Sequence, residues 1–346
     1  MAQTGETAQA GTTAATQAAT QAVTGKVRAW LYDACGHDHE ISADAIDPAA
    51  IAETQLVWID AEDPGPDLPA RLAALLGGDT RALQALLAAL DSDAPPAIEK
   101  YAGLFTLTLE LLPEGDMQAR AGFAVAEKWL ISLHRGEAAF LSSFREQDKA
   151  ETVIGLLSPP VLLASLLDWH LDTLLAAVAR IEESDDRLDQ HILNGGSSGW
   201  VLRAIVAVRR RISALRRTLG RQRQVFHALP RADLLIEVDE DARSHFERLS
   251  ARFDRVADEV EHAREVLIGS FELFASLAAQ STNELVKVLT FTTVVIGVFS
   301  AVAGLLGMNF RLAWFETGLT GFVTVVAALL AAAGAALWYA RRRGWI

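Results

Sequence analysis

The chain has 346 residues, 51% of them hydrophobic, and carries 44 acidic against 31 basic side chains, for a formal net charge of -13. This length suits one domain of ordinary size with room for further segments, and the acidic balance argues against a nucleic-acid partner. Cys35 is the only cysteine, which excludes a disulfide within one chain.

The first segment, residues 1–25, is rich in Ala, Thr, Gln and Gly and has no apolar period. Such a composition buries too little apolar surface to offset the entropy of ordering, so we predict a disordered tail. The segment also lacks the basic and apolar regions of a secretory signal peptide. No membrane-spanning segment is therefore expected before residue 288.

Residues 26–159 are predicted to form an α/β subdomain. Short apolar runs at 27–32, 56–59, 104–109 and 129–133 are typical of strands, and residues 68–90 have helical spacing. No nucleophile with a base and an orienting group is suggested, and no Gly-rich phosphate loop is present. The sequence therefore disfavours an enzyme.

Residues 160–242 are predicted to be the helical part of the same domain. An acidic run lies in the first helix and consists of Glu182, Glu183, Asp185 and Asp186. Charge runs are usually solvated helix faces. After a turn at 195–199, the next helix carries eight arginines over 200–229. Nucleic acid or a membrane surface would suit these arginines, but in an acidic chain we favour pairing with acidic faces of neighbouring helices or subunits.

Residues 243–287 are predicted to form a stalk helix. Apolar residues alternate by three and four along a seam at coiled-coil period: Phe246, Leu249, Phe253, Val256, Val260, Ala263 and Leu267. Gly269 is the only interruption before the next segment, and a helix tolerates one glycine at about 1 kcal/mol. We therefore expect one continuous helix of about 60 residues or more.

Residues 288–306 carry no charge and, at about 1.5 Å of rise per residue, span roughly the 30 Å of a bilayer core. They are predicted to be the first transmembrane helix. Small and polar residues share one stripe of this helix and of the turn before it: Asn283, Val286, Thr290, Thr293, Gly297, Ser300 and Gly304. A helix that is polar on one side is expected to line a water path.

A short loop at 307–317 leads to a second predicted transmembrane helix, residues 318–340, and a basic tail, 341–346, that contains Arg341, Arg342 and Arg343. By the positive-inside rule the tail is cytoplasmic, so the two-helix hairpin places both termini in the cytoplasm. The loop, with Glu316, then faces the outside.

The tripeptide Gly307-Met308-Asn309 at the end of the first of two C-terminal transmembrane helices resembles the signature of the CorA family of divalent-metal channels. Upstream, the family pattern Asn-Glu-x-x-Lys-x-Leu-Thr is matched by Asn283, Glu284, Lys287, Leu289 and Thr290. The chain departs from the family at Val298, where proline is common, at Leu306, where an aromatic residue is frequent, and at Gly297, where a bulky gate residue is usual.

The resemblance implies an α/β cytoplasmic domain, a stalk helix and a two-helix transmembrane hairpin, assembled as a funnel-shaped homopentamer in the lipid of the cell (inner) membrane. Mg²⁺, with Co²⁺ or Ni²⁺ as further ions, would pass along the first helix, which forms the pore. Asn309 and the carbonyl groups of Gly307 and Met308 would hold the hydrated ion at the outer mouth.

The same resemblance gives roles to other residues. Val286 or Leu289 would narrow the inner end of the pore. Lys287 would gather with Arg341, Arg342 and Arg343 at the inner membrane face, either as a basic collar or simply as anchors of the topology. The acidic run at 182–186 would bind regulatory divalent cations, as an alternative to a solvated face.

Three hypotheses remain open from the sequence. The first is a Mg²⁺ channel, and the second is a Zn²⁺ transporter of the same family. The third belongs to another class, a membrane-anchored coiled-coil scaffold or sensor that conducts nothing. That hypothesis explains the stalk but not the polar stripe or the signature.

Overall fold

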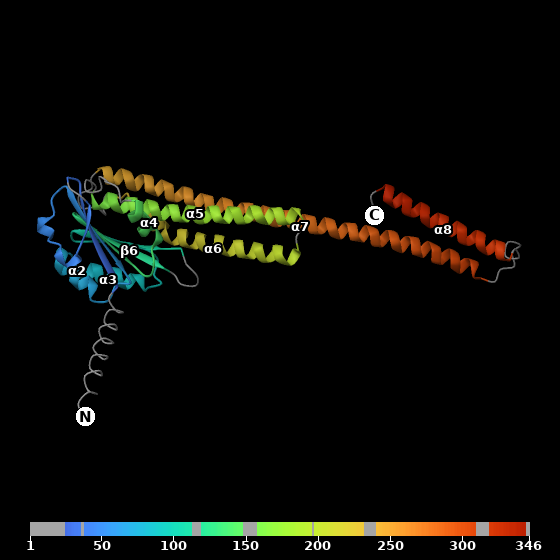
Figure 1. Ribbon diagram of the computed structural model, residues 1–346, viewed down its shortest axis with the longest axis horizontal. Helices are drawn as coiled ribbons and strands as arrows, with labels where there is room; N and C mark the ends of the chain where they lie inside the picture. Colours follow the sequence, from blue (N-terminus) through green and yellow to red (C-terminus); the bar gives the residue numbers. More distant parts are fainter. Residues whose placement is uncertain are drawn as a thin grey trace, which may run out of the picture. The chain divides into compact units, whose positions relative to one another are not determined.

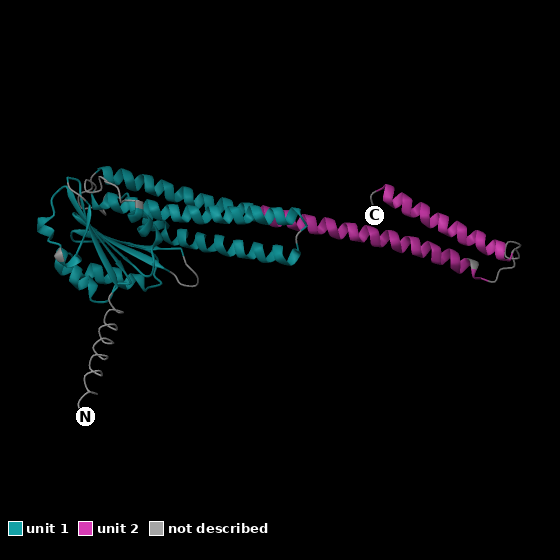
Figure 2. Ribbon diagram, viewed as in Figure 1, with its two compact units in different colours: residues 1–267 teal, residues 268–346 magenta. Residues whose placement is uncertain are grey.

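The computed structural model describes residues 25–35, 38–112, 119–147, 158–195, 197–231, 240–308 and 318–343. Residues 1–24 of the predicted tail at 1–25 and residues 309–317 of the predicted outer loop at 307–317 lie outside these ranges. The chain divides into two compact units, Met1–Leu267 and Ile268–Ile346 (Figure 2). The division falls within the segment predicted as the stalk.

Unit 1 contains a seven-stranded sheet in the order β2-β1-β3-β7-β6-β5-β4. The β3 and β7 strands are parallel, and the other neighbours are antiparallel. The strands are β1 Lys26–Asp33, β2 His39–Ile41, β3 Gln55–Glu62, β4 Ile98–Tyr101, β5 Leu104–Glu110, β6 Arg120–Ala126 and β7 Trp129–His134. All four predicted strands are present, while β2, β4 and β6 were missed.

One face of the sheet is covered by α2 Leu68–Leu76 and α3 Thr80–Leu90 (Figure 1). The helical spacing predicted over 68–90 is present, and it is divided between these two helices. Gly77 ends α2 in the left-handed region, at φ 69°, and Asp79 caps α3 by accepting a hydrogen bond from the Arg81 amide. Glycine reaches this conformation without steric cost, so the break is encoded locally.

The other face of the sheet is covered by α4 Ala139–Gln147, which was not predicted, and by the start of α5 Pro159–Leu193. Successive residues of a strand point to opposite faces. On β3, Val57 and Ile59 belong to the α2/α3 core, whereas Trp58 contacts Phe144 of α4 edge to face at 5.8 Å. Two buried layers therefore enclose the central strands.

A three-helix arm extends the domain. It consists of α5, α6 Ser198–Ala228 and the first part of α7 Glu240–Leu306. The α5–α6 turn lies where the sequence predicts it. The seam from Phe246 to Leu267 is buried, and Phe253 stacks on Phe226 of α6 with ring centroids 4.4 Å apart. The seam thus packs within its own chain, and α7, with 67 residues, confirms the predicted continuous helix.

Unit 2 consists of the remainder of α7 and of α8 Leu319–Arg342. Figure 1 shows α8 running back along the last part of α7. In both helices most side chains are exposed, including large apolar ones such as Leu289, Val294, Phe322 and Leu330. So much exposed apolar surface needs a cover of lipid or protein.

Candidate functional site

The predicted pore-lining residues lie on one exposed face of α7. Each of them, together with Leu289, is exposed in the single chain: Asn283, Val286, Leu289, Thr290, Thr293, Gly297, Ser300 and Gly304. Thr293 donates its hydroxyl to the carbonyl of Leu289 at 2.8 Å. The oxygen keeps a free lone pair for water, so the face is wettable without leaving an unsatisfied donor.

A second stripe on the same helix is partly buried. Its members are the larger residues Phe291, Val295, Phe299 and Val302. The matching stripe on α8 consists of Gly321, Val325, Leu329, Ala333, Ala336 and Ala340. Among the described residues of unit 2, each of these stripes can be shielded only by the opposite helix, so the two stripes form the contact between α7 and α8.

The geometry of the α-helix fixes the angle between the two stripes of α7. At 3.6 residues per turn, the centre of the polar stripe lies about 180° from the centre of the partly buried one. The polar residues therefore face away from α8. Placing α8 against lipid leaves the polar face of α7 to meet copies of itself or water.

Three described helices are long and apolar enough to cross a membrane: α5, α7 and α8. In α5, 56% of the most apolar 18-residue stretch is buried within the structure, whereas the corresponding stretches of α7 and α8 are 0% buried. The apolar face of α5 is already occupied by the sheet and by α6. Among the described residues, the apolar surfaces of α8 and of the unit 2 part of α7 are covered only along the stripes between these two helices. Composition alone does not make this distinction.

The signature lies where α7 ends. The Gly307 amide donates to the carbonyl of Ala303 at 2.9 Å, and the Met308 amide donates to that of Leu305 at 3.3 Å. The carbonyls of these two residues thus follow the last helical turn, where helix C-termini are negatively polarised. Asn309 and Glu316 lie outside the described residues.

The basic residues predicted as a collar lie toward one end of the α7–α8 pair. The α8 helix has 24 residues and runs back along α7 from near Leu306, so the C-terminal end of α8 lies close to the level of Lys287. Arg342 and Arg343 lie over the rings of Trp338 and Tyr339, at 5.2 and 5.5 Å. Aromatic and basic side chains together are typical of a membrane–water interface.

Among the described residues, the acidic run on α5 is not gathered into a metal site. Glu183 pairs with Arg187 one turn later, and Asp185 is buried, whereas Glu182 and Asp186 are exposed. Across the described residues no group of three or more His, Cys, Asp or Glu is placed to hold a metal ion.

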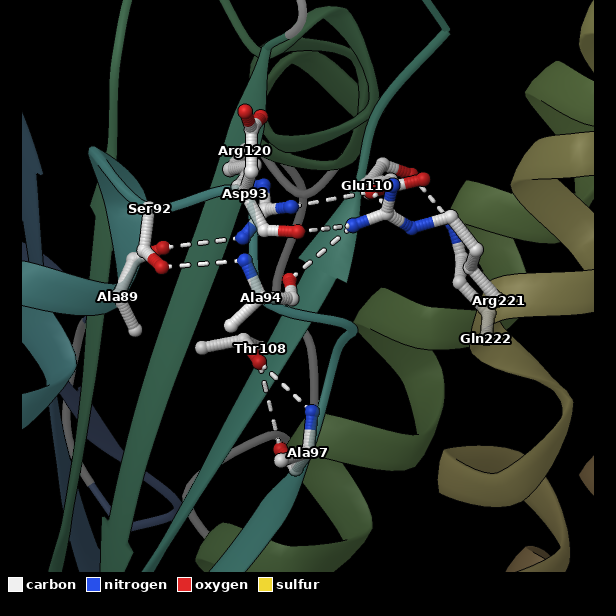
Figure 3. Close-up of polar contacts among 10 residues, drawn as sticks. All are labelled: Ala89, Ser92, Asp93, Ala94, Ala97, Thr108, Glu110, Arg120, Arg221 and Gln222. Carbon is white, nitrogen blue, oxygen red and sulfur yellow. Dashed lines mark hydrogen bonds and ion pairs between the residues drawn. The ribbon is translucent and has the colours of Figure 1, made fainter.

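The arginines of α6 are only partly paired, and one of their partners was missed by the sequence. Glu110 of β5 lies 3.1 Å from Arg120 of β6 and 2.8 Å from Arg221 of α6 (Figure 3). Gln222 donates to the Glu110 carbonyl and accepts from His170 at 3.3 Å. This buried cluster joins the sheet to the arm.

A second buried polar cluster joins β3 to β7. The Asp60 carboxylate accepts from Ser132 and pairs with Arg145 of α4, and His134 lies 3.3 Å away. Burial alone raises the Asp60 pKa, but His134, Ser132 and Arg145 outweigh it and hold that pKa below its usual value. Burial lowers the pKa of His134, but Asp60 and the Gly136 carbonyl outweigh it and raise that pKa.

These features define a class of protein: an α/β domain joined by one continuous helix to exposed, apolar C-terminal helices, one of them polar along the side away from its partner. The comparisons with known proteins agree. Residues 53–342 match the family model described as CorA-like Mg²⁺ transporter protein. The chain therefore belongs to the CorA family, which comprises transporters and not enzymes.

Individual relatives agree over nearly the whole chain. The cobalt/magnesium transport protein CorA of Methanocaldococcus jannaschii is 23% identical over 317 residues, 90% of this chain and 98% of the relative. Its complete structure, called a magnesium transporter, superposes with a TM-score of 0.72 at 22% identity, covering 92% of this chain and 98% of the other.

A zinc-related relative shares the fold of part of the chain. The cytoplasmic domain of ZntB from Vibrio parahaemolyticus superposes with a TM-score of 0.57 at 13% identity, covering 74% of this chain and 99% of that domain. At this identity the likeness shows the fold alone.

Proposed function

We propose that the chain assembles as a homopentameric channel that carries divalent cations, with Mg²⁺ as the principal ion and Co²⁺ as a second. The names of its relatives, cobalt/magnesium transport proteins, support this cargo. The observation that carries the proposal is the polar face of α7, which points away from α8. A channel needs such a face, whereas a non-conducting scaffold does not.

The proposed pore requires several copies because two helices cannot enclose a water path. In the pentamer α7 lines the pore, and α8 faces the lipid of the cell membrane. Both helices cross the bilayer, and the basic end at Arg341–Arg343 places the N- and C-termini in the cytoplasm. Unit 1 is then the cytoplasmic domain, and α7 carries its movements to the pore.

The proposed selectivity site is a ring of Asn309 side chains together with the carbonyls of Gly307 and Met308. Mg²⁺ is small and gives up its waters reluctantly, so a ring of oxygen acceptors suits the hydrated ion. Glu316 adds negative charge at the outer mouth. Because the ion is bound through its waters, Co²⁺ of similar size and geometry is accepted as well.

Substituted cysteines test the polar face. Thr293 and Thr292 are neighbours, both are exposed, and each donates its hydroxyl to a carbonyl four residues earlier. They differ by about 100° around the helix, and only Thr293 lies on the polar stripe. In a Cys35→Ser background, a water-soluble cationic thiol reagent should block Mg²⁺ flux into liposomes through Thr293→Cys and leave Thr292→Cys unaffected.

The same liposomes separate the competing functions. Mg²⁺ uptake driven by an imposed membrane potential supports the proposal, and block by high internal Mg²⁺ supports self-closure through unit 1. Zn²⁺ flux without Mg²⁺ flux would assign the chain to zinc transport. No flux of either ion from correctly assembled protein would leave the scaffold hypothesis.

A further inference from the structure

The helix α6 carries more positive charge than its own chain neutralises. It contains eight arginines and no acidic residue over 31 positions. Three of them pair within the chain: Arg216 with Glu261, Arg221 with Glu110 and Arg223 with Asp254. Among the described residues the others have no ion-pair partner, which leaves Arg203, Arg209, Arg210, Arg211 and Arg217.

Three of these unpaired arginines form one stripe. Arg203, Arg210 and Arg217 recur every seven residues and are all exposed. By helical geometry the stripe lies about 180° from the buried face of α6, so it points straight out of the arm. The exposed Val206 lies between the first two and gives the stripe an apolar component.

A stripe of opposite charge points out of α7. Asp258 and Glu265 are also seven residues apart and exposed, and neither has an ion-pair partner among the described residues. They lie about 180° from the buried seam that holds Val256 and Val260. Val266, next to Glu265, is 42% exposed. The chain therefore carries a basic and an acidic outward face on adjacent, antiparallel helices.

The two stripes also stand at matching heights. The ion pairs Arg216–Glu261 and Arg223–Asp254 fix the register of α6 against α7 within the chain. By that register Arg217 is level with Val260 and Arg210 with Leu267. Asp258 and Glu265 each lie two residues from those levels, about 3 Å along the axis, which is within the reach of an arginine side chain.

From this match we infer that the outward basic face of α6 in one copy binds the outward acidic face of α7 in the next, with Arg217 beside Asp258 and Arg210 beside Glu265. The contact joins two different faces, so it is head-to-tail, and in the proposed pentamer it repeats around an axis parallel to the helices. This inference rests on the oligomer of the proposed function and names its cytoplasmic interface.

The physical gain of such a contact is mainly in orientation and register. Exposed ion pairs contribute little individually, but opposed stripes exclude like-charge pairings and select one axial alignment. Two copies that meet α6 to α6 would juxtapose arginines with arginines. A nucleic acid or an anionic lipid surface could bind the arginines, but it would repel the nearby carboxylates of Asp258 and Glu265.

Paired cysteines test the interface in the full chain. Two differently tagged copies are expressed together in the Cys35→Ser background, one with Arg210→Cys and the other with Glu265→Cys, and membranes are oxidised mildly. A disulfide-linked dimer that carries both tags is expected. The pair Arg217→Cys with Asp258→Cys should give the same product. A chain with both Arg210→Cys and Glu265→Cys should give a ladder beyond dimers, since a two-fold contact would stop at two copies.

The matched control uses the same two stripes at unequal heights. In the control, Arg203→Cys is combined with Asp258→Cys. Arg203 lies 14 residues before Arg217, the matched partner of Asp258, so the two cysteines are about 21 Å apart along the helix axis. No cross-link is expected, because a disulfide needs Cα atoms within about 7 Å. Equal cross-linking of this pair would overturn the inference. So would the absence of cross-links at both matched pairs in copies whose tags co-purify.

Charge reversal provides a second measurement. Arg210→Glu with Arg217→Glu, or Asp258→Arg with Glu265→Arg, should lower the fraction of intact oligomer after dilution in detergent severalfold. The variant with all four changes should recover the wild-type fraction of intact oligomer. If that variant dissociates as readily as either double variant, the interface is contradicted. If tags of wild-type copies never co-purify, the proposed oligomer itself fails, which is a different result from co-purification without cross-links.

Discussion

Arg221 of α6 lies 2.8 Å from Glu110 of β5, whose carboxylate also holds Arg120 at 3.1 Å. One strand carboxylate thus neutralises two arginines, one from the sheet and one from the arm. The side chain of Arg120 is only 4% exposed. This contact, with Gln222 on the Glu110 carbonyl, ties the position of the arm to that of the sheet.

Removing the shared carboxylate should therefore be costly. Glu110→Gln leaves the buried Arg120 without a counter-charge, and we expect a loss of about 3 kcal/mol in the free energy of unfolding. The free energy of unfolding is measured on the full chain in detergent, from its tryptophan fluorescence at increasing denaturant concentration. The control Glu183→Gln breaks an exposed pair with Arg187 and should cost under about 0.5 kcal/mol. Equal effects of the two variants would contradict the cluster's role.

The pair Asp60–His134 should make the free energy of unfolding fall as the pH rises. The His134 pKa is raised in the folded state, so its contribution is present below the usual histidine pKa and is lost as pH rises through the raised value. Between about pH 6 and 9, the wild type should lose more stability than His134→Gln, as measured by the unfolding midpoint. Parallel pH profiles for the two proteins would exclude a charged His134.

His170 should act in the opposite direction. Burial lowers its pKa to about 4, and the hydrogen bond that His170 donates to Gln222 partly opposes the shift. A buried neutral histidine contributes stability above its unfolded pKa, and this is lost as pH falls from about 6.5 toward 4. The loss, on the order of 3 kcal/mol, should be absent in His170→Phe, whatever that variant's stability at neutral pH. If His170→Phe loses as much stability in acid as the wild type does, His170 is not a buried neutral histidine.

The inner constriction of the proposed pore is predicted at Val286 or Leu289. A polar side chain there would hydrate the constriction and allow ions through when the wild type is closed. Val286→Asn or Leu289→Asn should therefore raise Mg²⁺ flux at high internal Mg²⁺. Val288→Asn, exposed but about 160° from Val286 and about 100° from Leu289 around the helix, is the control. If neither variant leaks, the gate lies elsewhere.

The outer mouth is tested at Asn309. Asn309→Ala removes the proposed ring of carboxamides, and Mg²⁺ flux should fall at least tenfold while the oligomer persists on native mass spectrometry. Asn194→Ala, in the turn after α5, is a control for loss of a surface carboxamide. Full flux through Asn309→Ala would remove the signature from the selectivity site.

Sequence reasoning succeeded where the signal is local. A charge-free run of 19 residues specifies a membrane-compatible helix by composition. The small and polar stripe of α7 follows from helical period alone, and the family follows from contiguous motifs at 283–290 and 307–309. The strands found from sequence were apolar runs, whereas β6 carries Arg120 and Gly122, whose meaning depends on packing. A Cβ at Gly122 would lie 2.7 Å from the Leu86 side chain of α3, so any other residue there would require Leu86 to shift.

What the sequence by itself determined is thus the family, the continuous α7 helix and the face of α7 that is polar, because each depends on residues close together in the chain. Only the tertiary structure decided which helix faces were already covered: α5 is apolar enough to span a membrane but packs within unit 1. It also decided that Glu110 meets Arg221 across more than a hundred residues, and that the stripes of α6 and α7 stand at equal heights. These relations depend on contacts between distant segments, and local spacing carries no information about them.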